Sequence, residues 1–399
     1  MIQTSSNGNS PLSKRPVSVH VPFLDLKAQY ASIREDIAEA MHQVLDSAHY
    51  VGGERVERFE SEFARYVGAR YAVATGSGTG ALELVLRALG IGPGDEVIVP
   101  AYTFFATAEA VSIVGATPVF ADVHPQTCHL DAASAERYIT PRTRAIIPVH
   151  LHGRAMDLAE IEQLADARGL EIVEDACQAH GASRNGIRVG GSGRPACFSF
   201  YPGKNLGAYG DGGAVTCDDA KLAQSLRALR DHGSPAKYQH IAVGTNSRLD
   251  ALQAAVLSVK LPWLDEWNGR RARHAKTYLH ELECPGIQLP EPAPAGGHNY
   301  HLFVICTPQR DSLRAFLAEQ GIETGIHYPT PLHLTQAYQA LGYPGSGSLP
   351  VAERLTREVL SLPMYPELRH EQILEVARAI RDFASLQPAP GVVHAGSAS

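Results

Sequence analysis

The chain has 399 residues, of which 44% are hydrophobic and 19% are charged, and its formal net charge is −7. This composition is typical of a globular chain with a large core, and the length favours two structural domains. The acidic balance, without a basic stripe, argues against nucleic acid as the main partner. No apolar run is long enough to span a bilayer, so we expect no membrane partner either.

The two ends of the chain and its cysteines indicate where the protein works. The first 20 residues have no apolar centre, so we expect no secretory signal peptide. Their Ser, Asn and Pro content predicts a disordered tail over residues 1–20, and a second tail is predicted over residues 386–399. The six cysteines are scattered without a C-x-x-C pair, which favours reduced thiols in a cytoplasmic protein over a disulfide framework or a metal site.

Two helical patterns precede the first predicted strand. Apolar residues recur at three- and four-residue spacing over residues 29–47, and a second such pattern over residues 56–68 ends at Gly68, a candidate C-cap. From Tyr71 to Cys217, short apolar runs then alternate with helical stretches. This alternation predicts an α/β fold with a largely parallel sheet that is covered by helices on both faces.

The chain divides near Pro262, where a last apolar helical stretch ends. We assign residues 21–262 to a large domain and residues 263–385 to a smaller α+β domain. Ligands of a parallel sheet lie beyond the carboxyl ends of its strands, so we expect the functional site at that edge.

Lys204 is the strongest candidate for a reactive side chain. It ends the apolar, strand-like run FSFYPGK and has aromatic and glycine-rich sequence on both sides. Desolvation in such surroundings would lower the pKa of its amine and favour the neutral, nucleophilic form. The alternative is a surface lysine in a loop, which is where most lysines lie.

Asp175 ends a second strand-like run, LEIVED. Its carboxylate could form a charge-assisted hydrogen bond to a ring nitrogen. The alternatives are that Asp175 is a helix N-cap, or that the carboxylate of its neighbour Glu174 bonds to the ring nitrogen instead. Gln178 could reach a substituent of the same ring if the chain turns helical after Asp175, although a lone glutamine is more often a solvated amide.

Gly76–Gly80, with the sequence GSGTG, follows one predicted strand and opens a helix. Free backbone N–H groups and the positive end of the helix dipole make such a loop a phosphate site. The alternatives are a dinucleotide loop, for which the full G-x-G-x-x-G is absent, or a bare turn with a helix cap. Two histidines, His150 and His152, lie two apart on a predicted strand and are expected to be structural, without a metal.

An amine, a carboxylate and a phosphate loop together suit one cofactor. Pyridoxal phosphate (PLP) needs an amine for its aldehyde, an anion for its pyridine nitrogen and donors for its phosphate. We therefore interpret the chain as a PLP enzyme.

The chain also resembles a known family over most of its length, from about Pro22 to Phe383. The blocks that carry the resemblance, in order, are GSGTGALELVLRALGIGPGDEVIVPAYTFFATAEAV, PVHLHGRAMDL, EDACQAHGA, FSFYPGKNLGAYGDGGAV, GTNSRLDALQAAVLSVKL and TGIHYPTPLH. They resemble the PLP-dependent nucleotide-sugar aminotransferases of the DegT/StrS type. The resemblance implies an aspartate-aminotransferase-like fold (PLP fold type I), with a mainly parallel seven-stranded sheet in the large domain and a smaller α+β C-terminal domain. It also implies a homodimer with active sites at the subunit interface.

The resemblance assigns roles to individual residues. It implies that Lys204 forms the Schiff base with PLP, that Asp175 faces the pyridine nitrogen and that Gln178 lies beside the ring. The positions that match the family's phosphate-binding residues are Gly78, Thr79 and Ser199.

Four further positions are matched more loosely. Asn246 is similar to the asparagine that reaches the cofactor phosphate of the neighbouring subunit. Phe104 falls where an aromatic residue stacks on the ring, with Tyr102 as the alternative close by. His327, like Tyr102, is assigned to the sugar substrate.

The implied reaction moves an amino group from L-glutamate to a nucleotide-linked keto-sugar in deoxyamino-sugar biosynthesis. Several blocks look closest to enzymes that aminate C-3 of a dTDP-linked 3-keto-6-deoxyhexose. The alternatives are C-4 amination, a UDP-linked sugar, or a sugar dehydratase or regulator that keeps the fold without transamination. Some deoxygenating members have histidine in place of the lysine, so Lys204 favours transamination, and there is no cysteine cluster for an iron–sulfur centre.

Overall fold

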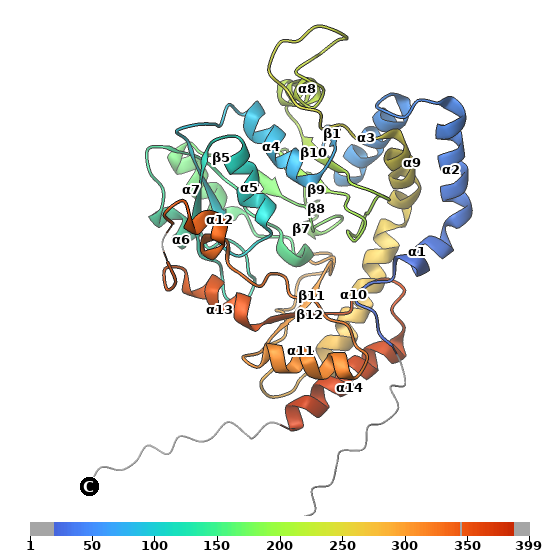
Figure 1. Ribbon diagram of the computed structural model, residues 1–399, viewed down its shortest axis with the longest axis vertical. Helices are drawn as coiled ribbons and strands as arrows, with labels where there is room; N and C mark the ends of the chain where they lie inside the picture. Colours follow the sequence, from blue (N-terminus) through green and yellow to red (C-terminus); the bar gives the residue numbers. More distant parts are fainter. Residues whose placement is uncertain (1–19, 344, 387–399) are drawn as a thin grey trace, which may run out of the picture.

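The computed structural model describes residues 20–343 and 345–386 (Figure 1). Apart from His20 and Leu386, the two tails predicted over residues 1–20 and 386–399 lie outside the described residues.

The centre of the N-terminal part of the chain is a sheet built from two four-stranded ladders, ordered β3-β2-β4-β5 and β1-β10-β9-β6. Its strands are β1 (Tyr71–Thr75), β2 (Glu96–Pro100), β3 (Thr117–Ala121), β4 (Thr143–Ile146), β5 (Glu171–Ile172), β6 (Glu174–Asp175), β9 (Ala196–Ser199) and β10 (Gly213–Cys217). β5 and β6 are pieces of one extended segment, separated by Val173, whose N–H donates to the carbonyl of Ile146 at 3.1 Å.

Counting that segment once gives seven strands for this sheet within the described residues. Every neighbouring pair is parallel except those that involve β10, which is antiparallel to both β1 and β9. The prediction of a mainly parallel seven-stranded sheet is therefore confirmed.

Helices cover both faces of this sheet, which is why its strands read as continuous apolar runs. One face packs against α4 (Gly78–Ala88), α5 (Phe105–Ile113) and α8 (Ala220–Leu229). The other packs against α3 (Glu54–Val67), α6 (Ala132–Arg137), α7 (Ala159–Arg168) and α9 (Ala251–Lys260). Adjacent strand residues alternate between the faces: Val73 contributes to the first core and Ala72 and Ala74 to the second.

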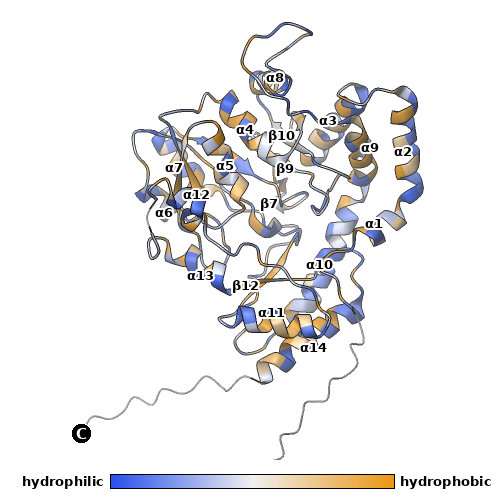
Figure 2. Ribbon diagram, in the orientation of Figure 1, coloured by the Kyte–Doolittle hydropathy of each residue, from blue (hydrophilic) through white to orange (hydrophobic). Residues whose placement is uncertain are grey.

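The helix predicted over residues 29–47 is two helices, α1 (Leu26–Ser32) and α2 (Arg34–Ser47), so the single-helix prediction is wrong. Ile33 breaks the helix, with φ −132°, and its buried side chain packs with Val256 and Trp267. The prediction for Gly68 is confirmed, because it ends α3 in the left-handed conformation with φ 89°. Figure 2 shows hydrophilic and hydrophobic residues alternating along α2, as expected for an amphipathic helix.

The C-terminal part of the chain forms its own core around a two-stranded antiparallel sheet of β11 (Phe303–Cys306) and β12 (Val359–Leu362). The helices of this core are α10 (Leu264–Glu281), α11 (Arg310–Glu319) and α14 (His370–Ser385). The smaller elements elsewhere are the hairpin of β7 (Ser183–Arg184) and β8 (Ile187–Arg188) and the 3-10 helices η1 (Leu151–Gly153) and η2 (Leu261–Trp263).

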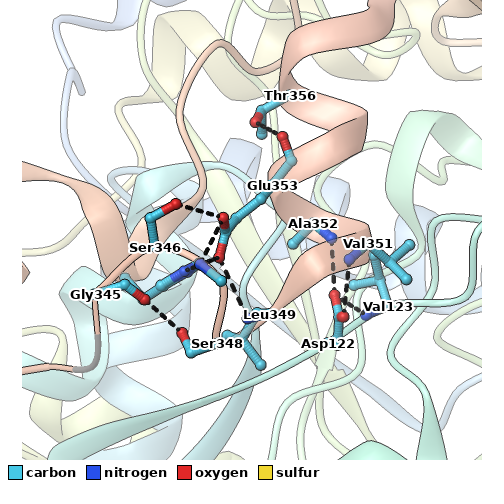
Figure 3. Close-up of polar contacts among 12 residues, drawn as sticks. Asp122, Val123, Gly345, Ser346, Ser348, Leu349, Val351, Ala352, Glu353 and Thr356 are labelled. Atoms are coloured by element: carbon cyan, nitrogen blue, oxygen red, sulfur yellow. Dashed lines mark hydrogen bonds and ion pairs between the residues drawn. The ribbon is translucent and has the colours of Figure 1, made fainter.

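Within the predicted small domain, one segment packs on the central sheet and its helices instead of on the C-terminal core. It comprises η3 (Leu332–Leu334), α12 (Gln336–Gln339) and α13 (Pro350–Glu358), whose apolar side chains join the core beneath α4 and α5. Figure 3 shows how Asp122 fixes this segment, since it accepts the N–H groups of Val351 (3.0 Å) and Ala352 (2.8 Å). Within the segment, Glu353 accepts from Ser346 Oγ (2.9 Å). The domain division near Pro262 stays a prediction.

Among the residues that the structure describes, no helix combines the length and the apolar character needed to cross a membrane.

Candidate active site

A cavity of about 640 Å³ lies at the carboxyl ends of the parallel strands and extends to the C-terminal core. Residues from both parts of the chain line it. Eight of the ten predicted site residues do so, namely Gly78, Thr79, Phe104, Asp175, Gln178, Ser199, Lys204 and His327. The location agrees with the expectation for an open parallel sheet.

Lys204 does not end a strand, contrary to the prediction. β9 ends at Ser199, and Lys204 lies in the following turn, where its N–H donates to the carbonyl of Tyr201 at 2.8 Å. Within the described residues, the half-buried amine of Lys204 forms no hydrogen bond and no ion pair. Desolvation lowers the pKa of Lys204 below its ordinary value, although the nearby Cys177 and Asp175 oppose this effect. The amine is thereby biased toward the neutral form.

Asp175 is buried at the end of β6, and both of its oxygens are held. Oδ1 accepts the N–H of Cys177 at 3.1 Å, and Oδ2 accepts the hydroxyl of Thr107 at 2.8 Å. Glu174, the alternative carboxylate, does not line the cavity and is bound to His150 Nε2 at 2.9 Å. Of the two acids, only Asp175 faces the cavity.

The glycine loop forms the N-terminus of α4, which begins at Gly78. The hydroxyl of Ser77 accepts the N–H of Gly80 at 3.0 Å, whereas the N–H groups of Gly78 and Thr79 have no partner among the described residues. A Cβ at Gly78 would lie 2.7 Å from Ser199 Cβ and 2.8 Å from Cys177 Sγ, so only glycine fits this floor. The prediction that this loop follows a strand and opens a helix is confirmed.

Gln178 and Phe104 lie near one tyrosine on the cavity wall. Gln178 accepts the N–H of His152 at 2.6 Å and donates to the Tyr328 hydroxyl at 2.9 Å, which fixes its amide. Phe104 is 53% exposed, and its ring lies 5.5 Å from that of Tyr328. Tyr102, in contrast, is buried away from the cavity and donates to the carbonyl of His327 at 2.5 Å.

His327 has fixed surroundings on the cavity wall. Its Nδ1 lies 2.9 Å from Ser361 Oγ, and its ring stacks on Phe23 at 5.7 Å. Burial, with a further contribution from the positive charge of Lys204, lowers the pKa of His327 to about 4. The imidazole is therefore neutral at physiological pH.

Three other predicted positions lie elsewhere than expected or outside the cavity. His150 and His152 are not on a strand, because β4 ends at Ile146 and His152 lies in η1 with φ 60°. Asn246 is exposed, does not line this cavity and accepts from Arg248 Nε at 3.0 Å. Its contact with a neighbouring subunit stays a prediction.

The structure adds functional candidates that the sequence reasoning missed: Thr107, Arg271, His301 and Tyr328. Thr107 could have been suspected, because it follows Thr103 by one helical turn in AYTFFAT, and their hydroxyls lie 3.1 Å apart. The others come from the C-terminal part of the chain and meet the sheet edge only in the fold. Within the described residues, no group of three or more His, Cys, Asp or Glu side chains is placed to hold a metal ion.

The fold and the site together define an aminotransferase. The chain belongs to the DegT/DnrJ/EryC1/StrS aminotransferase family, whose model matches residues 31–381. The dTDP-3-amino-3,4,6-trideoxy-alpha-D-glucose transaminase of Streptomyces venezuelae is 52% identical over 374 residues, which cover 94% of this chain and 98% of the relative.

Two solved structures are also similar. The crystal structure of S. venezuelae DesV in complex with a ketimine intermediate has a TM-score of 0.90 and 52% identity, covering 92% of this chain and 98% of that one. The structure of NtdA from Bacillus subtilis with bound cofactor PMP has a TM-score of 0.85 and 33% identity, covering 91% of this chain and 85% of that one.

Proposed function

We propose that the protein is a PLP-dependent aminotransferase that transfers an amino group from L-glutamate to C-3 of a dTDP-linked 3-keto-6-deoxyhexose. The observation that carries the proposal is the Lys204 amine, without a partner in the described residues, in one cavity with the buried carboxylate of Asp175. The family and the name of the S. venezuelae relative support the reaction class and the sugar.

The residues present fit PLP. The N–H groups of Gly78 and Thr79 at the start of α4, which no described residue accepts from, would hold its phosphate with Ser199 beside them. Asp175 would face its ring nitrogen, and Phe104 would cover one face of the ring. When bound, PLP supplies an aldehyde that carries the amino group and a ring that accepts electrons from the reacting carbon.

The chain's own side chains then transfer protons and hold the cofactor ring in position. Lys204 Nζ is the base that takes the proton from the α-carbon of L-glutamate, and in the second half-reaction it returns a proton at C-3 of the sugar. Asp175 holds a proton at the ring nitrogen through a charge-assisted hydrogen bond. Gln178 is held by His152 and Tyr328 and orients the ring edge. Because each product leaves before the next substrate binds, we expect ping-pong kinetics.

A homodimer with shared sites belongs to the same proposal. Asn246 lies outside the cavity of its own chain and is exposed, which suits a residue that reaches the cofactor phosphate of a second subunit. An Asn246→Ala variant should weaken cofactor binding, and mixing it with Lys204→Ala protein should restore part of the activity through hybrid dimers.

The central test is reduction of the holoenzyme with borohydride, followed by peptide mapping. Lys260 is a suitable rival, because burial lowers its pKa to about 8 as well, yet it donates to the carbonyl of Gly207 at 2.7 Å and lies outside the cavity. We expect the label on Lys204 and an unchanged label in Lys260→Met protein. A label on Lys260, or none, would refute the assignment.

The substrate is tested by offering L-glutamate together with dTDP- and UDP-linked keto-sugars and locating the new amine by NMR. The proposal predicts a 3-amino dTDP-sugar. A 4-amino product or a UDP-linked product would show that the substrate differs from the proposed one. Absence of any spectral response to amino donors would favour a dehydratase or regulator.

A further inference from the structure

Arg271, on α10, reaches the active-site cavity from the side of the C-terminal core. Its side chain is only 3% exposed and lines the cavity. One guanidinium nitrogen, Nη1, donates to the carbonyl of Met364 at 2.7 Å. Among the described residues, the buried Nε has no hydrogen-bond partner and neither does Nη2.

The unpartnered edge of this guanidinium matches one kind of ligand. Nε and Nη2 are the pair of donors that binds a planar carboxylate through two parallel hydrogen bonds. Burial lowers the pKa of Arg271 to about 10, so the group still carries its charge at neutral pH. A buried cation whose donors are unsatisfied is costly, and native proteins rarely keep one unless a ligand completes it.

The titratable groups that lie near Arg271 in the cavity are mainly basic side chains. His301 also lines the cavity, and the charges of Lys204, Arg271 and His327 help burial to lower its pKa, which places these groups near one another. The acidic residues that line the cavity are Asp175 and Asp211, and both oxygens of Asp175 already accept hydrogen bonds. Arg271 therefore supplies the positive charge at this end of the cavity, and that charge attracts an anion.

We propose that the Nε/Nη2 edge of Arg271 binds a carboxylate of the amino-acid donor and of the 2-oxo acid formed from it. This inference rests on the proposed aminotransferase function and adds the residue that selects the donor. The phosphate of the cofactor is assigned to the start of α4, so it does not compete for Arg271. The nucleotide diphosphate is a less suitable occupant, because the same cavity of about 640 Å³ must also hold the cofactor, which leaves a bulky nucleotide toward the opening.

Glu367 offers a competing explanation. One carboxylate oxygen of Glu367 is buried and has no partner within residues 20–343 and 345–386. Its charge acts on Arg271, but Glu367 does not line the cavity. If Arg271 serves only to neutralise Glu367, then removing the Glu367 charge should impair the enzyme in the same way as changing Arg271.

The test separates the two half-reactions by absorbance after rapid mixing. Holoenzyme is mixed with increasing L-glutamate, and enzyme loaded with the aminated cofactor is mixed with the keto-sugar nucleotide. For Arg271→Gln we expect the half-saturating L-glutamate concentration to rise about 10- to 100-fold, and for Arg271→Lys somewhat less, with the sugar half-reaction within about twofold of wild type.

Two variants serve as matched controls. Arg310 is likewise a buried arginine that donates to backbone carbonyls, those of Thr356 and Val359, but it does not line the cavity, so Arg310→Lys should leave both half-reactions unchanged. Glu367→Gln should also leave the response to L-glutamate unchanged. Arg271→Lys keeps the charge and can still reach a carbonyl, so it is the variant to measure if Arg271→Gln does not fold.

The donor itself identifies the carboxylate that is bound. With 4-aminobutyrate, which lacks the α-carboxylate, wild type and Arg271→Gln should react alike if Arg271 binds that group. With L-glutamine, which lacks the γ-carboxylate, they should react alike if Arg271 binds the distal group.

Three results would overturn the inference: an unchanged L-glutamate response in Arg271→Gln and Arg271→Lys, a larger loss in the sugar half-reaction, or the same loss in Glu367→Gln. A larger loss in the sugar half-reaction would assign Arg271 to the diphosphate of the sugar nucleotide. Failure of the wild-type holoenzyme to respond to any amino donor would instead refute the proposed function.

Discussion

The hydroxyl of Thr107 donates a hydrogen bond of 2.8 Å to Oδ2 of Asp175 and so ties α5 to the end of β6. The N–H of Cys177 holds the other carboxylate oxygen, at 3.1 Å. The orientation of the acid that would face the cofactor ring is thus set by two neighbours from different elements.

Removing the Thr107 hydroxyl should reduce the rate without removing the chemistry. Thr107→Val keeps the branched shape but leaves Oδ2 of Asp175 without its donor, and we expect kcat to fall about tenfold, the value of one hydrogen bond to a charged group. Asp175→Asn should cost about 10²- to 10³-fold, because the charge itself is lost. Steady-state kinetics check both, with Thr103→Val as a control one step further from the carboxylate. A Thr107→Val rate equal to that of wild type would remove Thr107 from the positioning of Asp175.

Gly78 tests the floor of the predicted phosphate site. A methyl group at Gly78 would meet Ser199 Cβ at 2.7 Å and Cys177 Sγ at 2.8 Å, so Gly78→Ala should destabilise the fold by about 1–3 kcal/mol and weaken cofactor binding. Gly269 is a suitable control, because a methyl group there would meet only Arg273 Nη1, at 3.6 Å. Denaturant unfolding and cofactor titration measure the two effects. Normal cofactor affinity in Gly78→Ala protein would place the phosphate elsewhere.

The two aromatic candidates of AYTFFAT should behave differently. Phe104 lines the cavity, so Phe104→Leu should weaken cofactor binding roughly two- to tenfold through loss of ring contact. Tyr102 is buried outside the cavity, so Tyr102→Phe should leave cofactor affinity unchanged. It should lower the free energy of unfolding by about 1 kcal/mol, because the hydrogen bond to the carbonyl of His327 is lost. Fluorescence titration of the apoenzyme with PLP distinguishes them. If Tyr102→Phe weakened cofactor binding and Phe104→Leu did not, Tyr102 would be the residue that stacks on the cofactor ring.

Much of the site was predictable because it is built on the regular part of the fold. Asp175 ends a strand and the loop of Gly76–Gly80 follows one, and the alternation of strands and helices brings such positions to one edge of the sheet. The apolar surroundings of Lys204 point to it in the sequence, but they do not reveal the turn that carries it, because the run FSFYP stays apolar past the end of β9 at Ser199.

What could not be predicted depends on contacts between segments far apart in the chain. The break at Ile33 is set by packing against Val256 and Trp267, and helical periodicity alone does not record such a contact. Arg271 has no neighbouring sequence signal, because its place in the cavity follows from how α10 meets the sheet edge. Tyr102 and Phe104 are two residues apart, and only the fold shows which of them is buried.

His180 makes the stability of the protein sensitive to acid. Its ring lies 5.4 Å from that of Phe198 and 5.8 Å from that of Phe200, and both ring nitrogens are buried without a hydrogen-bond partner in the described part of the chain. Burial, with a smaller contribution from the charge of Lys204, lowers the pKa of His180 from 6.5 to about 3. Between these two pH values the unfolded chain binds a proton at His180 that the folded chain does not.

Stability should therefore be fully present above pH 6.5 and decline as the pH falls toward 3, by about 1.4 kcal/mol per pH unit for each such histidine. His180→Leu removes one of them, so its free energy of unfolding should fall less steeply between pH 6 and pH 4, by about that amount per unit. His42→Leu, an exposed substitution on α2, should keep the wild-type slope. Urea unfolding of the holoenzyme followed by circular dichroism at several pH values measures the three slopes. Equal slopes in wild type and His180→Leu would mean that the imidazole gains a proton partner in the folded protein, which the two unpartnered nitrogens argue against.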